Sequence, residues 1–198
     1  MNYLAHLFFA DPTPHSILGS LAADHFKGAI EKHDPRFADA IRIHRRIDAF
    51  TDSHPAVGTS RRRLEPRFGH YGRIIIDIFH DHLLATSWEH YHAELFDDFT
   101  RRMNEVIGAS IELLPPATAA RFERMALQNW IASYRTIEGI RKALHYTSKR
   151  LKRAVALDRA TEELIHDRDS FDRDFHAFFP ELIDEVDVFR ATLAGGAE

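Results

Sequence analysis

The chain has 198 residues, of which 44% are hydrophobic and 28% are charged, and its formal net charge is −4. This length can bury a core without disulfides, and the acidic balance argues against a nucleic-acid-binding protein. The lack of cysteine excludes disulfides, zinc–thiolate sites and thiol nucleophiles, whereas 14 histidines favour metal or acid–base chemistry. Any metal site must therefore use nitrogen and oxygen ligands.

The first residues, MNYLAHLFFADPTP, form a short apolar run that contains His6 and lacks a basic leader. This is a poor signal peptide, and no run of about 18 apolar residues follows it. We therefore expect a cytoplasmic protein without a membrane partner.

The rest of the chain predicts an all-α fold, a helical bundle formed by one domain over residues 1–198. Stretches rich in Ala, Leu, Arg and Glu are separated by Pro and Gly, without hairpin signals or sustained alternation. The segment RIIIDIF at 73–79 could be a buried strand, but its unbroken continuation favours a helix. The expected helices span 14–27, 36–51, 55–66, 71–90, 91–112, 117–134, 136–145, 147–157 and 160–192. We expect the Gly195–Gly196 tail to fray.

The first chemical signal in chain order is Asp24, in a short segment, GSLAADHFKG, that Gly28 closes. Asp24 beside His25 is consistent with a surface pair or with a functional carboxylate. His6 lies in apolar company, where a buried structural histidine is the more common outcome.

The stretch HRRIDAFTD at 44–52 places His44 and Asp48 four residues apart, with Asp52 continuing the row. Ile47 belongs to a different face of the same helix, so the row is separate from the apolar side. By itself this pattern is typical of a solvated face, and Arg45 and Arg46 could be surface residues.

The predicted helix over 71–90 favours a functional site over a solvated face. Its apolar residues point in nearly every direction, which is typical of a buried helix. Asp77 and Asp81 are four residues apart in it and share one face. Two carboxylates cannot both stay charged in a dry interior without a cation. Either arginine side chains pair with the two carboxylates or solvent hydrates them, or a hard divalent cation lies between them. A metal site shared with His44 and Asp48 is the more economical explanation.

Other segments carry weaker signals. The acidic run HDRDSFDRD at 166–174 has Phe171 where a calcium loop needs an oxygen ligand, so it predicts a solvated helix face. The basic runs RRR at 61–63 and KRLKR at 149–153 are either solvated or dock an acidic partner. Four phenylalanines between 171 and 179 follow helical spacing and predict core. Nucleotide-binding and serine-hydrolase motifs are absent from the sequence.

Four motifs, MNYLAH, GSLAAD, HRRIDAFTD and DIFHDHLLA, occur in an order and at separations that resemble the acyl carrier protein phosphodiesterase family. NWIASYRTIEGIRKAL and SKR extend the resemblance to residues 1–180. It implies an all-helical, HD-domain-like phosphohydrolase that uses manganese or another divalent ion. The metal ligands that it implies are Asp24, His44, Asp48, Asp77 and Asp81. His80 departs from the family, which has an aromatic residue at this place.

The resemblance implies hydrolysis of holo-acyl carrier protein to the apo form and 4′-phosphopantetheine. Mn²⁺ or Mg²⁺ would neutralise a phosphate oxygen and activate water. His6 or His82 would be the general acid, and Arg45 or Arg46 would steady the phosphate. Two alternatives stay open: an HD-like phosphohydrolase acting on a nucleotide or another small phosphoester, and a non-catalytic helical module that binds an acidic protein.

Overall fold

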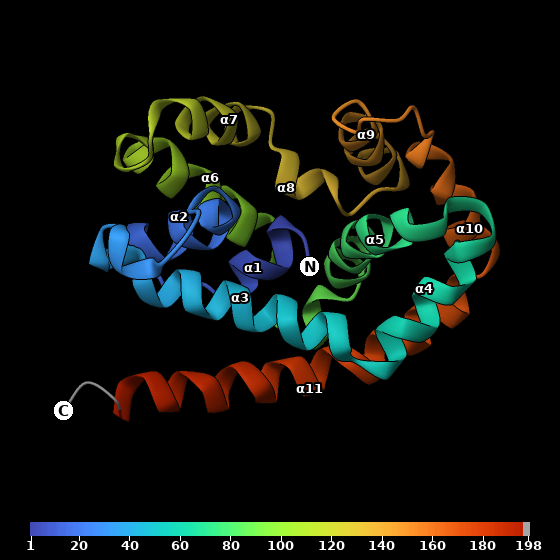
Figure 1. Cartoon of the computed structure of the whole chain (residues 1–198), viewed down its shortest axis with the longest axis horizontal. Coiled ribbons are helices and arrows are strands. Elements are labelled where there is room, and N and C mark those ends of the chain that lie inside the picture. Colours follow the sequence, from blue (N-terminus) through green and yellow to red (C-terminus); the bar gives the residue numbers. More distant parts are fainter. Residues whose placement is uncertain (196–198) are drawn as a thin grey trace.

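The computed structural model describes residues 1–195, and all regular structure in this range is helical, which confirms the predicted all-α class (Figure 1). No helix in this range is both long and apolar enough to cross a membrane. The tail residue Gly195 ends the last helix, and Gly196 lies outside the described range. The helices are α1 (Tyr3–Phe8), α2 (Pro14–Ala22), α3 (Ala38–Ser53), α4 (Pro55–Phe68), α5 (Gly72–Thr86), α6 (Phe96–Ser110), α7 (Pro116–Leu127), α8 (Trp130–Ser133), α9 (Ile137–Ser148), α10 (Ala160–His166) and α11 (Arg168–Gly195).

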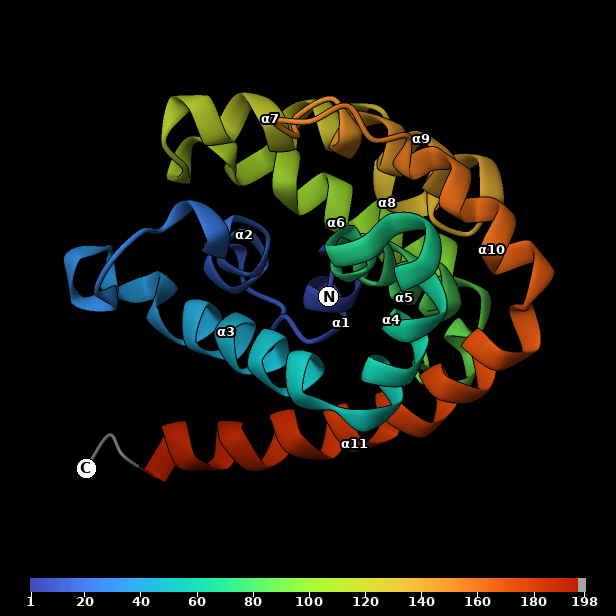
Figure 2. The same cartoon turned by 45° about the vertical axis from the view of Figure 1, so that its right-hand side comes forward.

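The short helix α1 lies in the middle of the other helices, with the N-terminus inside the assembly (Figures 1 and 2). It packs against α2 and α5, and Leu4, Ala5 and Leu7 are almost fully buried. α3 packs against α2 and against the long α11, while α7, α8 and α9 lie on the opposite side of α1. Chemistry-bearing residues from α1, α3 and α5 can therefore meet in the centre.

The predicted helix boundaries differ from the structure where tertiary contacts or local breaks decide them. α1 was not predicted, because six residues carry too little local signal and the helix depends on its burial. The predicted helix over 117–134 breaks before α8, where Asn129 has a φ of +48°. The predicted helix over 147–157 is wrong, since α9 ends at Ser148 and only a 3₁₀ turn, Leu157–Arg159, follows. The predicted helix over 160–192 divides at Asp167 into α10 and α11.

The apolar face of α11 forms much of the core next to α3, α4 and α5. Phe171, Phe175, Phe178 and Phe179 are at most 1% exposed, which confirms the prediction from their spacing. His80 of α5 stacks on Phe178, with ring centroids 5.2 Å apart and an interplanar angle of 23°. The imidazole thus fills an aromatic position in the core.

The crossing of α2 and α3 leaves no room for a side chain at Gly19. A Cβ there would lie 2.6 Å from the Cβ of Ala40. We expect Gly19→Ala to lower the free energy of unfolding by about 1–3 kcal/mol, because the two helices must move apart. Urea denaturation measures this change. Gly108→Ala in α6 is the control: a Cβ there has open space, so this variant should be stabilised by about 0.5–1 kcal/mol. Equal stability of Gly19→Ala and the wild type would contradict the close approach.

Candidate metal centre

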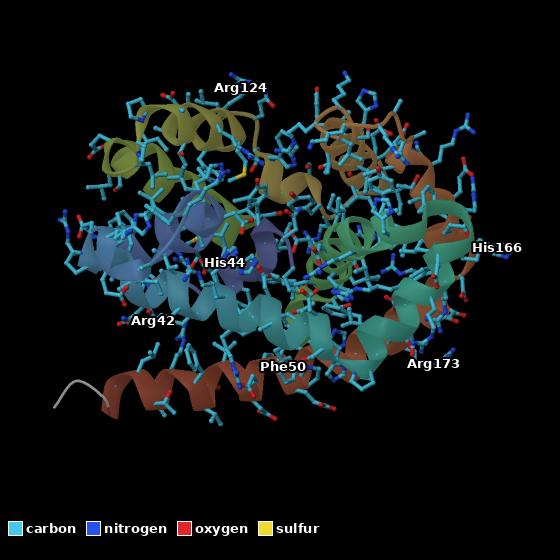
Figure 3. All side chains as sticks on the ribbon, in the orientation of Figure 1. Arg42, His44, Phe50, Arg124, His166 and Arg173 are labelled. Atoms are coloured by element: carbon cyan, nitrogen blue, oxygen red, sulfur yellow. The ribbon has the colours of Figure 1, made fainter. Side chains whose placement is uncertain are left out.

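The centre is built on α3, where His44 and Asp48 are one helical turn apart. His44 is 5% exposed, and its Nδ1–H donates to the carbonyl oxygen of Ser20 on α2 at 2.9 Å (Figure 3). This hydrogen bond fixes the ring and leaves Nε2 facing two carboxylates. Nε2 lies 3.3 Å from Asp48 Oδ2 and 3.5 Å from Oδ1 of Asp24, which sits at the exposed rim.

His6 completes the cluster from α1. Its ring stacks on that of His44, with centroids 3.7 Å apart and an interplanar angle of 12°, and its Nε2 lies 3.3 Å from Asp48 Oδ1. His6, His44 and Asp48 each offer one ligand atom, and these atoms all lie within 4.8 Å of one another. The sequence placed His6 in the role of a proton donor, whereas its position is that of a third ligand.

Asp77 of α5 meets the cluster through the amino group of Met1. This ammonium group donates to Asp77 Oδ1 at 3.0 Å and to Asp48 Oδ1 at 3.3 Å. The Met1 ammonium group thus lies between Asp77 and Asp48, whereas the sequence predicts a divalent cation or an arginine between Asp77 and Asp81. Asp77 lies at the edge of the cluster.

Asp81 is fully buried one turn further along α5, and its carboxylate binds backbone rather than the cluster. Oδ2 accepts from the N–H of Leu4 at 2.9 Å, and Oδ1 accepts from the N–H of Ala5 at 3.1 Å. Burial raises the pKa of Asp81 to about 7, although these two hydrogen bonds favour the ionised form. The contacts assign Asp81 to holding the first turn of α1 in place, which in turn positions His6.

Arg45 and Arg46 do not reach the cluster. Arg45 donates to the carbonyl oxygens of Phe26 and Gly28, and Arg46 pairs with Glu185 of α11 at 2.5 Å. Successive residues of a helix point about 100° apart, so neighbours of His44 cannot share its face. Both arginines therefore make contacts within the protein, and the phosphate contact that the sequence predicts for them stays a prediction.

His82 is likewise held away from the cluster. Its Nδ1–H donates to the carbonyl oxygen of Tyr134 at 2.8 Å, and its Nε2 accepts from Arg168 at 2.9 Å. Burial lowers the pKa of His82. A neutral ring that accepts a hydrogen bond from a guanidinium is a poor general acid, so these contacts favour a structural role.

The protonation states of the cluster residues are compatible with the binding of a divalent cation. Burial and the neighbouring His44 lower the pKa of His6 to about 4, so its ring is neutral at pH 7. Burial opposes the charged form of His44, but Asp24 and Asp48 outweigh it and raise its pKa to about 9. Burial opposes ionisation of Asp48, but the two neighbouring imidazoles outweigh it and lower the pKa of this carboxyl group. His44 Nε2 is buried without a hydrogen-bond partner of good geometry, which fits a ligand atom for a divalent ion.

These charges predict how metal binding depends on pH. His44 carries a proton at pH 7 because its pKa is raised, and an ion bound at Nε2 must displace that proton. We expect release of about one proton per metal ion at pH 7 and about a tenfold rise in affinity per pH unit between pH 6 and 8. Calorimetry of Mn²⁺ binding in two buffers of different ionisation enthalpy measures the proton count. Proton-neutral binding would contradict a ligand role for His44.

The cluster opens into a cleft of about 520 Å³, which is lined by His6, Asp24, His44 and Asp77 and, on its other side, by Arg121 and Arg150. Arg150 belongs to the basic run 149–153, which the sequence singled out as a possible docking segment. Arg121 of α7 carries no sequence signal, since only the packing of α7 beside α1 brings it here. The other basic run is used internally, because Arg61 pairs with Asp52 and Arg63 with Asp174.

The fold and this cluster define an all-helical protein with a candidate metal centre made of nitrogen and oxygen donors. The family profile described as acyl carrier protein phosphodiesterase matches residues 1–182. The chain belongs to this family, which confirms the resemblance found in its motifs.

Similar curated proteins support the same relationship over the whole chain. An acyl carrier protein phosphodiesterase from Pectobacterium atrosepticum is 30% identical over 190 residues, covering 92% of this chain and 96% of that protein. The Klebsiella pneumoniae protein of the same name is 29% identical over 185 residues, with the same coverage. The Yersinia enterocolitica one is 27% identical, covering 94% of this chain and 97% of that protein. No solved structure matches the chain, so the HD-like relationship stays a prediction.

Proposed function

We propose that this protein is a metal-dependent phosphodiesterase that hydrolyses holo-acyl carrier protein to apo-acyl carrier protein and 4′-phosphopantetheine. The observation that carries the proposal is one cleft lined by both histidines of the His6–His44–Asp48 cluster and by two arginines, in a chain of the acyl carrier protein phosphodiesterase family. Hydrolysis of a phosphodiester uses both parts of this arrangement: a cation that binds the phosphate oxygens and a group that orients the phosphate.

In this proposal His6, His44 and Asp48 hold a Mn²⁺ or Mg²⁺ ion, and Asp24 and Asp77 complete the acidic rim. A bound ion would supply Lewis acidity to the phosphate and lower the pKa of a water. Ser20 fixes the tautomer of His44 through its carbonyl oxygen, so that Nε2 points into the site. Asp81 holds α1 in position, and thereby the His6 ring.

The chain would act as one domain, and its substrate would be an acidic carrier protein rather than a nucleic acid. The basic residues of segment 149–153 are exposed, and one of them, Arg150, lines the cleft, so this segment would favour such a partner.

The test is incubation of purified protein with holo-acyl carrier protein, with Mn²⁺ and with a chelator, and identification of the products by mass. We expect 4′-phosphopantetheine and apo-carrier protein only when the metal is present. Turnover of nucleotides but not of carrier protein would replace the proposal by a small-phosphoester hydrolase. Tight binding of carrier protein that survives chelation and yields no product would replace it by a binding module.

A further inference from the structure

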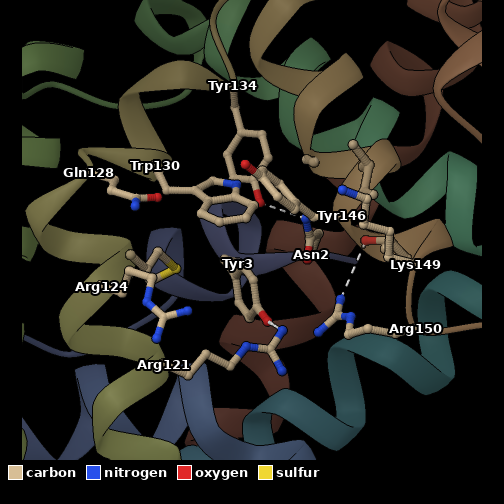
Figure 4. A pocket seen from close by; sticks show the side chains of 14 residues that line it. Asn2, Tyr3, Arg121, Arg124, Gln128, Trp130, Tyr134, Tyr146, Lys149 and Arg150 are labelled. Atoms are coloured by element: carbon tan, nitrogen blue, oxygen red, sulfur yellow. Dashed lines mark hydrogen bonds between the residues drawn. The ribbon is translucent and has the colours of Figure 1, made fainter.

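A second cavity, of about 500 Å³, adjoins the cleft of the metal centre and is enclosed by α7, α8 and α9 (Figure 4). We call it the aromatic pocket. It shares Asn2, Tyr3, Arg121 and Arg150 with the cleft, so the same side chains border both spaces. A cavity of this size is typical of sites that enclose a small organic molecule.

Two guanidinium groups meet at the boundary between the cleft and the aromatic pocket. Arg121 donates to the hydroxyl of Tyr3, and Arg150 donates to Thr147 at 3.4 Å beside it (Figure 4). Burial raises the pKa of Tyr3, and the positive charges of the two nearby guanidinium groups oppose that shift. Within residues 1–195 neither arginine has a carboxylate within salt-bridge distance, unlike Arg61 and Arg63. Two convergent, unneutralised guanidinium groups form a site for an anion such as a phosphate.

Arg124 and Lys149 also line the aromatic pocket, and the rest of its lining suits an uncharged chain that carries amides. Trp130 and Tyr146 form one wall, with ring centroids 5.5 Å apart. The amides of Gln128 and Asn2 face the same space, and the Asn2 amide donates to the Tyr134 hydroxyl at 2.8 Å. Aromatic walls pack against methyl and methylene groups, while side-chain amides pair with peptide-like amides.

We propose that the aromatic pocket binds the pantetheine arm of the substrate, with its phosphate held by Arg121 and Arg150 at the mouth facing the metal centre. This inference rests on the proposed function, because it assigns the two halves of that substrate to two adjoining spaces. The phosphate then lies between the arginines and the metal ligands, and the carrier protein remains outside the cleft.

Binding of free 4′-phosphopantetheine, measured in the presence of a chelator, tests the pocket independently of turnover. Trp130 lines the pocket, whereas Trp88 is 1% exposed within the core, so the ligand should change the fluorescence of the wild type but not of Trp130→Phe. By calorimetry, Arg121→Ala and Arg150→Ala should each weaken 4′-phosphopantetheine binding by about tenfold to a hundredfold. Binding of pantetheine, which lacks the phosphate, should change less than about twofold in both variants.

Arg173→Ala is the matched control, since Arg173 is exposed on α11 and points away from the molecule (Figure 3). It should bind 4′-phosphopantetheine as the wild type does. Arg150 is exposed, so its variant should fold even if loss of the Arg121 contact destabilises α7. Circular dichroism of each variant verifies folding.

Three results would overturn the inference. The first is unchanged affinity for 4′-phosphopantetheine in Arg150→Ala, and the second is an equal loss of pantetheine affinity. The third is quenching of Trp130 by apo-carrier protein as strong as that by the holo form, which would mean that the pocket binds the protein surface. Failure of the proposed function looks different, because the wild type would then release no 4′-phosphopantetheine from holo-carrier protein with Mn²⁺.

Discussion

Asp48→Asn should lower kcat/KM for holo-acyl carrier protein by about a thousandfold, equivalent to about 4 kcal/mol of transition-state stabilisation. The carboxylate lies within 3.3 Å of both imidazoles and of the Met1 ammonium, so it links three other groups of the centre. Asparagine keeps the size of the side chain but removes its negative charge. The measurement is product formation at fixed Mn²⁺, together with the metal content of the purified variant.

Asp52→Asn is the control for this prediction. Asp52 is the next acidic residue in the same helical row, but it pairs with Arg61 and Arg73 instead of the histidines. Its replacement should leave kcat/KM within about threefold of the wild type, because exposed ion pairs contribute little. Equal losses of kcat/KM in both variants would mean that the negative charge along this face of α3 matters, rather than the contact of Asp48 with the histidines.

The sequence predicts the α3 half of the centre because that half is local. A helix brings residues four apart to one face, so the spacing places His44 and Asp48 together, and the acidic pair in the helix over 71–90 and the family motifs then favour a site over a solvated face. The same rule, applied more strictly, argues against Arg45 and Arg46, which lie about 100° and 200° around the helix from His44. The structure accordingly uses them for contacts with residues 26–28 and with α11.

The other half depends on tertiary structure and has no local signature. His6 joins the cluster only because α1 is buried in the middle of the assembly, and α1 exists there because Asp81 binds its first N–H groups. The spacing of Asp77 and Asp81 puts both carboxylates on one side of α5, where they bind different groups, and their role as metal ligands stays a prediction. The spacing cannot tell that those groups are the Met1 ammonium and backbone N–H groups.

The two arginines that line the cleft illustrate the same limit. The sequence has 26 lysines and arginines, and the HRRID motif directs attention to Arg45 and Arg46, whose phosphate contact stays a prediction. Arg121 is distant from every motif and reaches the cleft through the packing of α7. Arg150 lies in a basic run that the sequence did single out, although as a docking surface rather than as part of the cleft.

His82→Ala should separate a structural role from a catalytic one. We expect the free energy of unfolding to fall by about 2–4 kcal/mol, because the substitution leaves a cavity and removes the partner of a buried carbonyl. The ring joins the Tyr134 carbonyl to Arg168, and thereby links α8 to the start of α11. Per folded molecule, kcat should stay within about threefold of the wild type, since a neutral ring held by Arg168 donates no proton to the substrate; a lost general acid would cost about a hundredfold or more.

Urea denaturation gives the stability of His82→Ala, and product formation at a temperature where the variant remains folded gives kcat. His166→Ala is the matched control, because His166 is exposed at the end of α10 and points outward (Figure 3). Its stability should change by less than about 0.5 kcal/mol. A hundredfold fall of kcat in His82→Ala with unchanged stability would restore His82 as the general acid. The opposite pattern would leave His82 as a structural link, with His6 the only one of the two histidines in the metal centre.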